Sequence, residues 1–366
     1  MKRKEGVGLS AVARVLILSS GIAMLAACGG GESSGPGASA PVADVTISGT
    51  AAAGAPIIGQ VTVKDATGIM RTTDIRADGG YSISVSGLTA PFLFRAQGQV
   101  GGRQIIVTSA ATSADLNGTI NITPFTDLIV ANMAGQLASQ YFDNPDFALL
   151  TDAELNEAKT TLTQRLLPVL SDLGIDGGFD LMRTAFRADH SGIDAVLDVI
   201  RVTVDADTNT AIIRDLINNT QIADDLASQT DNSVIAVPAI ALSGAVTDLQ
   251  AIEAQLNTLN GLLATSLPSP DSPVLLALFA TDGSFLHSGY DLESWINDLT
   301  SDPGVLGASL ISPTITKYVD ANTVHIGFVF KEADGSMELA LDGDNAFVMK
   351  KVDGVWRIAG NYRPVD

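Results

Sequence analysis

The residue whose side chain most clearly indicates a chemical role is Cys28, the single cysteine of the 366-residue chain. Residues 2–4 are basic, and an uncharged run at 15–27 ends in small residues directly before this thiol. A membrane-spanning helix needs about 20 apolar residues, so the shorter run is typical of a cleaved secretion signal. The pattern predicts that residues 1–27 are removed and that the Cys28 sulfur carries acyl chains. Each buried CH₂ of such a chain contributes about 0.8 kcal/mol to membrane attachment.

The segment Leu25-Ala26-Ala27-Cys28 resembles the lipobox of bacterial lipoproteins. The resemblance implies signal cleavage, attachment of fatty acids such as palmitate to Cys28, and a mature chain held to a membrane by lipid. In that family an Asp after the cysteine often retains the protein at the inner membrane, whereas the next residue here is Gly29. The resemblance therefore implies the outer membrane, with the chain on its periplasmic or cell-surface face. An uncleaved membrane anchor is the alternative interpretation.

The charge balance limits the partners of the chain. It carries 21 basic and 41 acidic residues, a formal net charge of −20. Such a surface repels the phosphates of nucleic acids and anionic lipid headgroups, so we expect no nucleic-acid partner and a membrane contact made through lipid. With one cysteine no intramolecular disulfide can form, so stability must come from apolar cores. The sequence does not indicate the oligomeric state.

The common catalytic signatures are absent from the sequence. It contains no glycine-rich phosphate loop followed by Lys, no Gly-x-Ser-x-Gly and no His-Glu-x-x-His. No histidine lies within five residues of another, which disfavours a clustered zinc site. Asp205, Asp207 and Asn209 imitate the first ligands of a calcium loop, but the glycine and the closing glutamate of that loop are missing, and hairpin turn residues explain the same letters. We expect no metal, no cofactor and no catalytic residue.

Four polar residues near the C-terminus are the candidates for a ligand-binding site: Asp282, His287, Tyr290 and Asn361. They lie on segments whose side chains can face the inside of the C-terminal domain. A carboxylate or imidazole of perturbed pKa against an apolar wall is the usual basis of acid–base catalysis in such a cavity. The alternative is that each is a surface or strand-end residue, as lone polar residues near turns usually are.

Apart from Cys28, two N-terminal stretches contain no candidate residues for catalysis. Residues 28–42, which contain the lipidated cysteine, are rich in Gly, Ser and Pro and predict a flexible tether. Over residues 43–124, short alternating apolar runs are separated by glycine-containing turns, which predicts an antiparallel β-sandwich. This stretch resembles the carboxypeptidase regulatory-like or prealbumin-like modules, which implies a spacer or binding module without catalytic residues. The resemblance rests on ISG at 47–49, VTV at 61–63 and ADGGYSI at 77–83.

Residues 125–238 predict a mainly helical domain. A capping box beginning at Thr151 opens a long apolar stripe of helical period. Ser191 is expected to cap a further short helix. Residues 202–205 and 211–213 alternate around a polar turn, which predicts a hairpin.

Residues 239–366 predict an α+β domain. Apolar residues spaced three and four apart from Leu242 to Leu263 predict one long amphipathic helix. Residues 282–286 predict a strand, and the period-two alternation further on predicts an antiparallel sheet. This domain resembles the nuclear-transport-factor-like cone fold, which implies a curled sheet around a pocket and hosts isomerases and dehydratases as well as inactive domains. The resemblance rests on the segments 278–285 and 349–358.

The sequence therefore predicts a multidomain chain: an all-β sandwich, a mainly helical middle and a cone-like α+β domain. We expect a lipid-anchored, non-catalytic protein of the cell envelope that binds a protein or glycan or serves as a scaffold. The alternative is a small-molecule-binding, isomerase-type or lyase-type activity in the C-terminal domain.

Overall fold

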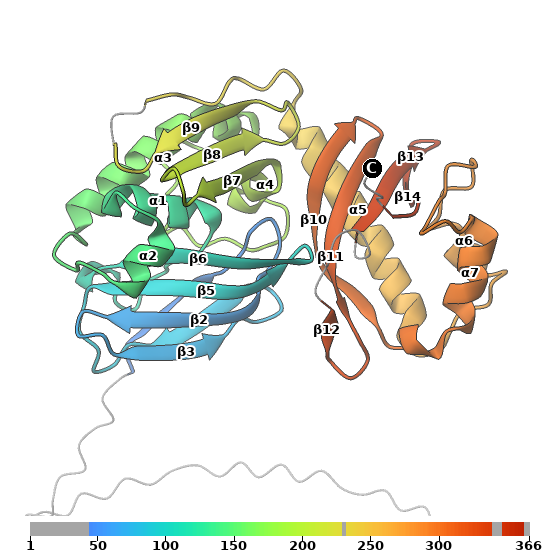
Figure 1. Cartoon of the computed structure of the whole chain (residues 1–366), viewed down its shortest axis with the longest axis horizontal. Coiled ribbons are helices and arrows are strands. Elements are labelled where there is room, and N and C mark those ends of the chain that lie inside the picture. The colour runs from blue at the N-terminus through green and yellow to red at the C-terminus, as the bar shows by residue number, and fades with distance from the viewer. Residues whose placement is uncertain (1–43, 229–231, 339–345, 362–366) are drawn as a thin grey trace, which may run out of the picture. The chain divides into compact units, whose positions relative to one another are not determined.

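The computed structural model describes residues 44–228, 232–338 and 346–361. The signal segment, Cys28 and the tether lie outside the described residues, so the expectations for them stay predictions. The chain from Asp44 to Asp366 forms one compact unit. Its described residues fold into several antiparallel sheets and seven α-helices, which confirms a mixed, β-rich chain of multidomain character (Figure 1).

The first six strands form two antiparallel sheets. β1 pairs with β4, and the second sheet has the order β3-β2-β5-β6. Side chains of both sheets, among them Ile47, Val61, Tyr81 and Phe94, form one buried cluster. Each fully buried apolar side chain contributes about 1.5–3 kcal/mol, so the period-two alternation of these strands holds the two sheets together. The strands are β1 Thr46–Thr50, β2 Ile58–Asp65, β3 Met70–Asp74, β4 Gly80–Ser84, β5 Phe92–Val100 and β6 Arg103–Ala111.

The middle of the chain combines four helices with a three-stranded antiparallel sheet of order β7-β8-β9. At the start of α1, the Thr123 hydroxyl accepts from the Thr126 N–H and the Thr126 hydroxyl accepts from the Thr123 N–H, a reciprocal cap. Buried apolar side chains of these helices and strands form a second cluster. The elements are α1 Pro124–Ala134, α2 Ala138–Asp143, α3 Asp152–Asp172, α4 Ile193–Val199, β7 Ile200–Asp205, β8 Thr210–Asp215 and β9 Gln221–Asp225, preceded by a 3-10 turn at Ser113–Asp115.

The last part of the chain packs the long helix α5 against a curled antiparallel sheet of order β10-β11-β13-β14, with β12 beside β11 (Figure 1). The apolar stripe of α5 and the inner face of the sheet form a third buried cluster. The elements are α5 Leu242–Leu263, α6 Pro273–Leu276, α7 Leu292–Ser301, β10 Ser309–Asp320, β11 Thr323–Lys331, β12 Met337–Glu338, β13 Ala346–Val352 and β14 Val355–Ile358, with a 3-10 turn at Pro303–Val305.

Two local predictions are wrong. Residues 282–286 form no strand; only an isolated bridge joins Leu286 to Gly360, because the Asp282 carboxylate accepts the Ser284 N–H and closes a turn. Gly192, not Ser191, is the N-cap of α4, since the Ser191 hydroxyl donates to Asp189 instead. The helix itself and the hairpin of β7 and β8 are confirmed.

The three parts touch through backbone and side-chain hydrogen bonds around β10. The Gly101 N–H, at the tip of the β5–β6 hairpin, donates to the Ser312 carbonyl at 3.0 Å. The Ser312 hydroxyl donates to the Pro56 carbonyl at 2.8 Å. β10 is therefore the strand of the C-terminal sheet that contacts the first part of the chain.

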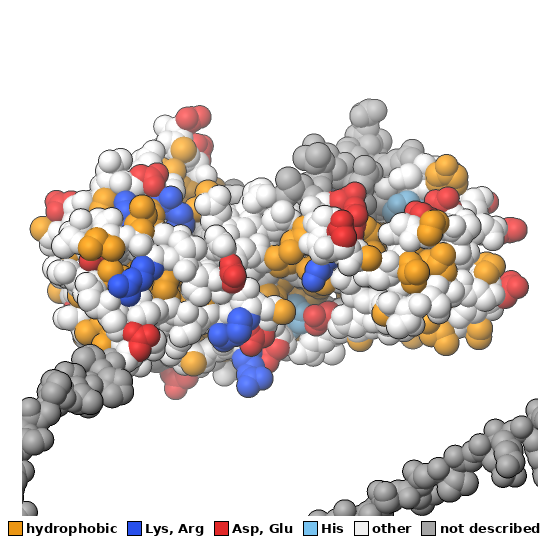
Figure 2. All heavy atoms as spheres, turned by 90° about the horizontal axis from the view of Figure 1, so that it is seen from below, with side chains coloured by type: hydrophobic (Ala, Val, Ile, Leu, Met, Phe, Trp, Pro, Cys, Tyr) orange, Lys and Arg blue, Asp and Glu red, His pale blue; other side chains and the backbone are white. Residues whose placement is uncertain are grey.

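The surface of the described chain is mixed in character. The face drawn in Figure 2 intersperses acidic, basic and hydrophobic side chains. Within the described ranges, no helix combines the length and the apolar character needed to cross a membrane.

Candidate functional site: an arginine pocket beside a buried histidine–carboxylate cluster

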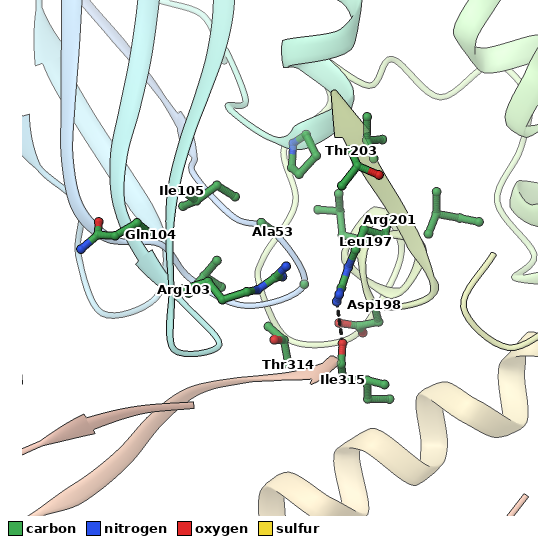
Figure 3. Close-up of a pocket in the computed structure, with 15 residues that line it drawn as sticks. Ala53, Arg103, Gln104, Ile105, Leu197, Asp198, Arg201, Thr203, Thr314 and Ile315 are labelled. Atoms are coloured by element: carbon green, nitrogen blue, oxygen red, sulfur yellow. Dashed lines mark hydrogen bonds between the residues drawn. The ribbon is translucent and has the colours of Figure 1, made fainter. Parts of the chain in front are cut away.

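A cavity of about 160 Å³, here called the arginine pocket, lies where β6, β7 and β10 meet. Arg103 is the first residue of β6, and Arg201 lies on β7 directly after α4. Both side chains extend toward the same space from different elements (Figure 3). The polar part of the lining is completed by Gln104, Asp198, Thr203 and Thr314.

The position of Arg103 depends on the glycine turn before it. Gly101 has φ +53°, and a Cβ at this residue would lie 1.9 Å from the Thr314 Oγ1. A side chain at residue 101 would therefore clash with β10 as well as strain the backbone. Glycine thus allows the β5–β6 hairpin to approach β10 closely, which brings Arg103 into the pocket.

Neither arginine forms an ion pair with a described carboxylate, although Asp198 also lines the pocket. No Asp or Glu oxygen among the described residues lies within 4.0 Å of either guanidinium, and the Arg201 Nη2 donates to the Ile315 carbonyl at 2.7 Å. Burial, followed by the charges of Arg103 and Arg214, lowers the pKa of Arg201 to about 10. Burial also lowers the pKa of Arg103. Two guanidinium groups that face one cavity favour an anion between them, since guanidinium groups bind carboxylate and phosphate with paired hydrogen bonds.

One buried hydroxyl of the pocket is not used by the fold. Thr314 is 4% exposed, and its Oγ1 has no hydrogen-bond partner in the structure. A buried hydroxyl without a partner costs roughly 1–3 kcal/mol, so a polar ligand in this cavity would recover that free energy. The pocket therefore has the charge and the hydrogen-bonding groups to bind an anion, and it has no arrangement of nucleophile and base.

Beside the pocket lies a second polar group, the histidine–carboxylate cluster, defined as His190, Asp194, Asp198 and Glu253. The His190 Nδ1 is 3.0 Å from the Asp198 Oδ2 and 4.0 Å from the Asp194 Oδ2, and its Nε2 is 3.3 Å from the Glu253 Oε2. Asp194 and Asp198 are four residues apart on α4 and share a face of that helix. His190 has φ +60° and its N–H donates to the Asp194 Oδ2 at 2.8 Å, which turns the chain into α4.

The electrostatics of the cluster follow from its three carboxylates. Burial would lower the pKa of His190, but its bonds to Asp198 and Glu253 and the surrounding negative charge raise it to about 10. Burial and then the charge of Asp198 raise the pKa of Asp194 to about 8. Burial raises the pKa of Asp198 to about 6 despite its bond to His190. The cluster attracts positive charge, and a protonated His190 supplies part of it.

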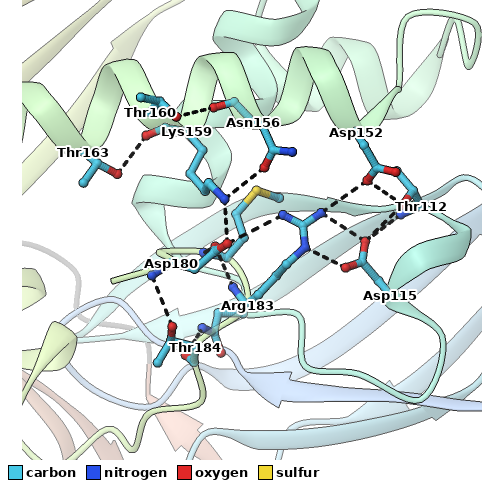
Figure 4. Close-up of polar contacts among 12 residues, drawn as sticks. Thr112, Asp115, Asp152, Asn156, Lys159, Thr160, Thr163, Asp180, Arg183 and Thr184 are labelled. Carbon is cyan, nitrogen blue, oxygen red and sulfur yellow. Dashed lines mark hydrogen bonds and ion pairs between the residues drawn. The ribbon is translucent and has the colours of Figure 1, made fainter. Parts of the chain in front are cut away.

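A third polar network is fully paired and serves the fold. The Arg183 guanidinium reaches the buried Asp115 at 2.6 Å and lies within 4.0 Å of Asp152 and Asp180 (Figure 4). Lys159 on α3 pairs with Asp180 at 2.6 Å. This network fastens the loop around Arg183 to α3 and to the end of the first sheets. Each nitrogen of the Arg183 guanidinium lies within 4.0 Å of a protein carboxylate, in contrast to those of Arg103 and Arg201.

The four predicted ligand-binding residues belong neither to the arginine pocket nor to the histidine–carboxylate cluster. Asp282 is exposed and pairs with Lys350 at 3.1 Å; its hydrogen bonds with Ser284 and then Lys350 lower its pKa to about 2. His287 and Tyr290 are joined by two backbone hydrogen bonds in a tight turn, and Tyr290 is 54% exposed. Asn361 is buried, and its amide donates to the Ser288 hydroxyl while its carbonyl accepts the Ser288 N–H. His287, Tyr290 and Asn361 are thus close together, Asp282 is separate, and none lines the arginine pocket.

The inner face of the C-terminal sheet is packed core. Phe328, Phe347 and Met349 are at most 5% exposed and pack in the cluster that includes α5. Trp356 is 3% exposed, and its Nε1 donates to Asp248 of α5 at 2.9 Å. Side chains therefore occupy the described space between α5 and the sheet, where the cone-fold resemblance implies a pocket.

Neither the arginine pocket nor the histidine–carboxylate cluster is predicted from the sequence. The two arginines stand in different parts of the chain, and no local pattern joins them. The cluster did leave a signal, because His190, Asp194 and Asp198 are spaced by four.

No protein-family model, curated protein or solved structure matches this chain.

Proposed function

We propose that the protein is a lipid-anchored, non-catalytic binding protein of the bacterial cell envelope, and that its arginine pocket receives the anionic group of an acidic glycan. The observation that carries the binding role is the pair Arg103 and Arg201, which face one cavity without a carboxylate partner among the described residues. The lipobox-like segment ending in Cys28 supports the anchoring role. In this proposal the acyl chains hold the protein at the membrane, and the arginine pocket binds the ligand.

The dimensions and lining of the pocket support the class of ligand. A cavity of about 160 Å³ leaves room for one charged group and the atoms attached to it. A uronic acid carboxylate or a sugar phosphate can accept from both guanidinium groups. Thr203, Thr314 and the Gln104 amide suit the neighbouring sugar hydroxyls. A protein ligand with an exposed Asp or Glu side chain is the competing outcome.

The module resemblances belong to the same proposal. The first six strands would form a carboxypeptidase regulatory-like sandwich that contributes Arg103. The C-terminal domain would be a nuclear-transport-factor-like domain whose packed interior makes it a structural partner, since β10 supplies Thr314 to the pocket. No described feature favours the alternative of isomerase-type or lyase-type activity in this domain.

Calorimetric titration of the detergent-solubilised full-length protein tests the binding role. The probes are D-glucuronate, D-glucose phosphate and, as the neutral control, D-glucose. We expect saturable binding of an acidic sugar and none of glucose. Arg103→Gln should weaken binding at least tenfold, because it removes one charge-assisted contact worth about 1.5–3 kcal/mol.

The matched control is Arg76→Gln. The Arg76 side chain is 61% exposed, pairs with Asp78 at 3.5 Å and does not line the pocket, so its loss should leave affinity unchanged. Equal binding by wild type and Arg103→Gln, or binding of glucose as tight as glucuronate, would refute the proposed site. Binding of acidic peptides but of neither acidic sugar would show a protein ligand instead.

A further inference from the structure

We propose that His190, Asp194 and Asp198 form a binding site for one divalent transition-metal ion, with Glu253 orienting the histidine ring. This inference does not depend on the ligand of the proposed function, because it rests on the histidine–carboxylate cluster, which shares only Asp198 with the lining of the arginine pocket. It concerns a site for Zn²⁺ or Mn²⁺ that the chain builds at the junction of α4 and α5.

The first argument is the geometry of the donor atoms. The His190 Nδ1, one Asp194 oxygen and one Asp198 oxygen all lie within 4.8 Å of one another. Zn²⁺ holds imidazole nitrogen and carboxylate oxygen at about 2.0–2.2 Å, so small side-chain rotations bring three such atoms around one ion. The loop at His190 and the face of α4 supply these donors from nine consecutive positions of the chain, which keeps them together.

The second argument is the state of the carboxylates. Asp194 is 0% and Asp198 is 4% exposed, and the Oδ1 atoms of both are buried without a hydrogen-bond partner. Buried carboxylate oxygens are normally bonded, because an unpaired buried charge is costly. Each of the two carboxylates therefore has one buried oxygen that no protein donor occupies, which leaves coordination capacity for a cation.

The third argument is the partner of the other ring nitrogen. If Nδ1 binds the ion, Nε2 carries the proton, and the Glu253 Oε2 lies 3.3 Å from it. A carboxylate that accepts from the non-coordinating nitrogen fixes the tautomer and orientation of a metal-binding histidine. Glu253 comes from α5, so ion binding would join α5 to α4 through His190.

The fourth argument is access. His190 and Glu253 line a cavity of about 230 Å³ on one side of the cluster, and Asp198 lines the arginine pocket on the other. The ion therefore has a route from solvent and space for a water ligand. One imidazole among carboxylates suits Zn²⁺ or Mn²⁺ better than Mg²⁺ or Ca²⁺, which prefer oxygen-only sites.

The test begins with full-length protein in detergent, stripped with EDTA and titrated calorimetrically with Zn²⁺, Mn²⁺, Mg²⁺ and Ca²⁺. We expect one equivalent of Zn²⁺ or Mn²⁺ to bind, and Mg²⁺ and Ca²⁺ to bind at least tenfold more weakly. Asp198→Asn should abolish binding, and Glu253→Gln should weaken it 10- to 100-fold, as loss of such a histidine partner typically does. Asp205→Asn, a change at an exposed hairpin carboxylate, is the control and should have no effect.

Because Asp198→Asn changes a buried residue, two further readouts keep the test decisive. Glu253 is partly exposed, so Glu253→Gln should fold, and its thermal unfolding is compared with and without metal. Co²⁺ replacing Zn²⁺ should give visible absorption typical of mixed nitrogen and oxygen ligands, which a purely structural ion pair cannot produce. Absence of stoichiometric binding, or identical affinity in wild type and Glu253→Gln, would overturn the metal site and leave protonated His190 as the only counter-charge.

Discussion

At the scale of single residues, the arginines differ in what lies next to their charge. Arg165 on α3 contacts Asp224, both side chains at most 3% exposed, and Arg183 contacts Asp115. Breaking such buried pairs leaves an uncompensated charge, so these arginines hold the fold. Arg103 and Arg201 share a cavity instead of a carboxylate. This contrast is why we assign ligand binding to the second pair.

Asp127 provides a pH prediction at the same scale. This partly buried residue in the first turn of α1 accepts the Thr108 N–H at 2.7 Å, yet burial raises its pKa from 3.8 to about 7. A raised pKa in the folded state means that the folded protein holds the proton more tightly. Its contribution to stability is therefore fully present below pH 3.8 and is lost as the pH rises through about 7.

The test compares wild type with Asp127→Asn, which keeps the acceptor oxygen but carries no charge. We expect the free energy of unfolding of the variant, relative to that of wild type, to increase by on the order of 1 kcal/mol as the pH rises from 5 to 8. Urea unfolding at both pH values measures the difference. A difference that does not change with pH would contradict the raised pKa.

At the scale of elements, periodic patterns were good predictors where one face is buried. The stripe from Leu242 to Leu263 coincides with α5 because its apolar residues are buried. Those from Leu249 to Leu263 lie in the C-terminal cluster, and Leu242 lies in the middle one. The β7–β8 hairpin was also predicted, and the Asp205 carboxylate accepts the Asp207 N–H inside its turn. Here the local sequence contains the determining interaction.

Prediction from sequence failed where a local turn takes the place of a strand and where distant contacts decide. Residues 282–286 had the composition of a strand, but the turn at Asp282 leaves only Leu286 to meet the last strand region. The arginine pocket needs Gly101 to approach Thr314, a contact between distant parts of the chain that no local period encodes. The spacing of His190, Asp194 and Asp198, by contrast, is a local pattern that can be read from the sequence.

The packing of α3 against β9 gives a prediction at the element scale. The Arg165 guanidinium bonds to the Asp224 carboxylate and to the Ala223 carbonyl, and the Asn132 amide donates to the same Asp224. Arg165→Met leaves a buried carboxylate without its cation, so we expect a loss of about 3–5 kcal/mol of unfolding free energy. Chemical denaturation measures it.

The double variant Arg165→Met with Asp224→Leu is the informative companion. Replacing both members of a buried ion pair by apolar residues is often close to neutral. We expect the double variant to be more stable than Arg165→Met alone. A double variant that is less stable than the single one would show that Asp224 is stabilised without Arg165.

At the scale of the whole molecule, the arginine pocket depends on three parts of the chain: the β5–β6 hairpin, β7 and β10. Each part has its own buried cluster, and the pocket lies where they meet. Ligand sites occur preferentially at such junctions, because side chains from different units converge there. Ligand binding would therefore stabilise the contacts among these parts.

Membrane attachment is the second prediction at this scale. In the native bacterium, wild-type protein should incorporate radiolabelled palmitate and fractionate with the outer membrane. Cys28→Ser removes the only thiol and should abolish both labelling and membrane association, because the proposed function assigns the attachment to acyl chains on that sulfur. A Cys28→Ser protein that stays membrane-bound without label would contradict lipid anchoring.

The most direct measurement is a crystal structure of the protein grown with D-glucuronate. We predict that the sugar carboxylate lies within hydrogen-bonding distance of both Arg103 and Arg201, with a sugar hydroxyl near the Thr314 Oγ1. A structure in which glucuronate occupies another surface, or in which the two guanidinium groups contact only water at saturating glucuronate, would contradict the proposed binding site.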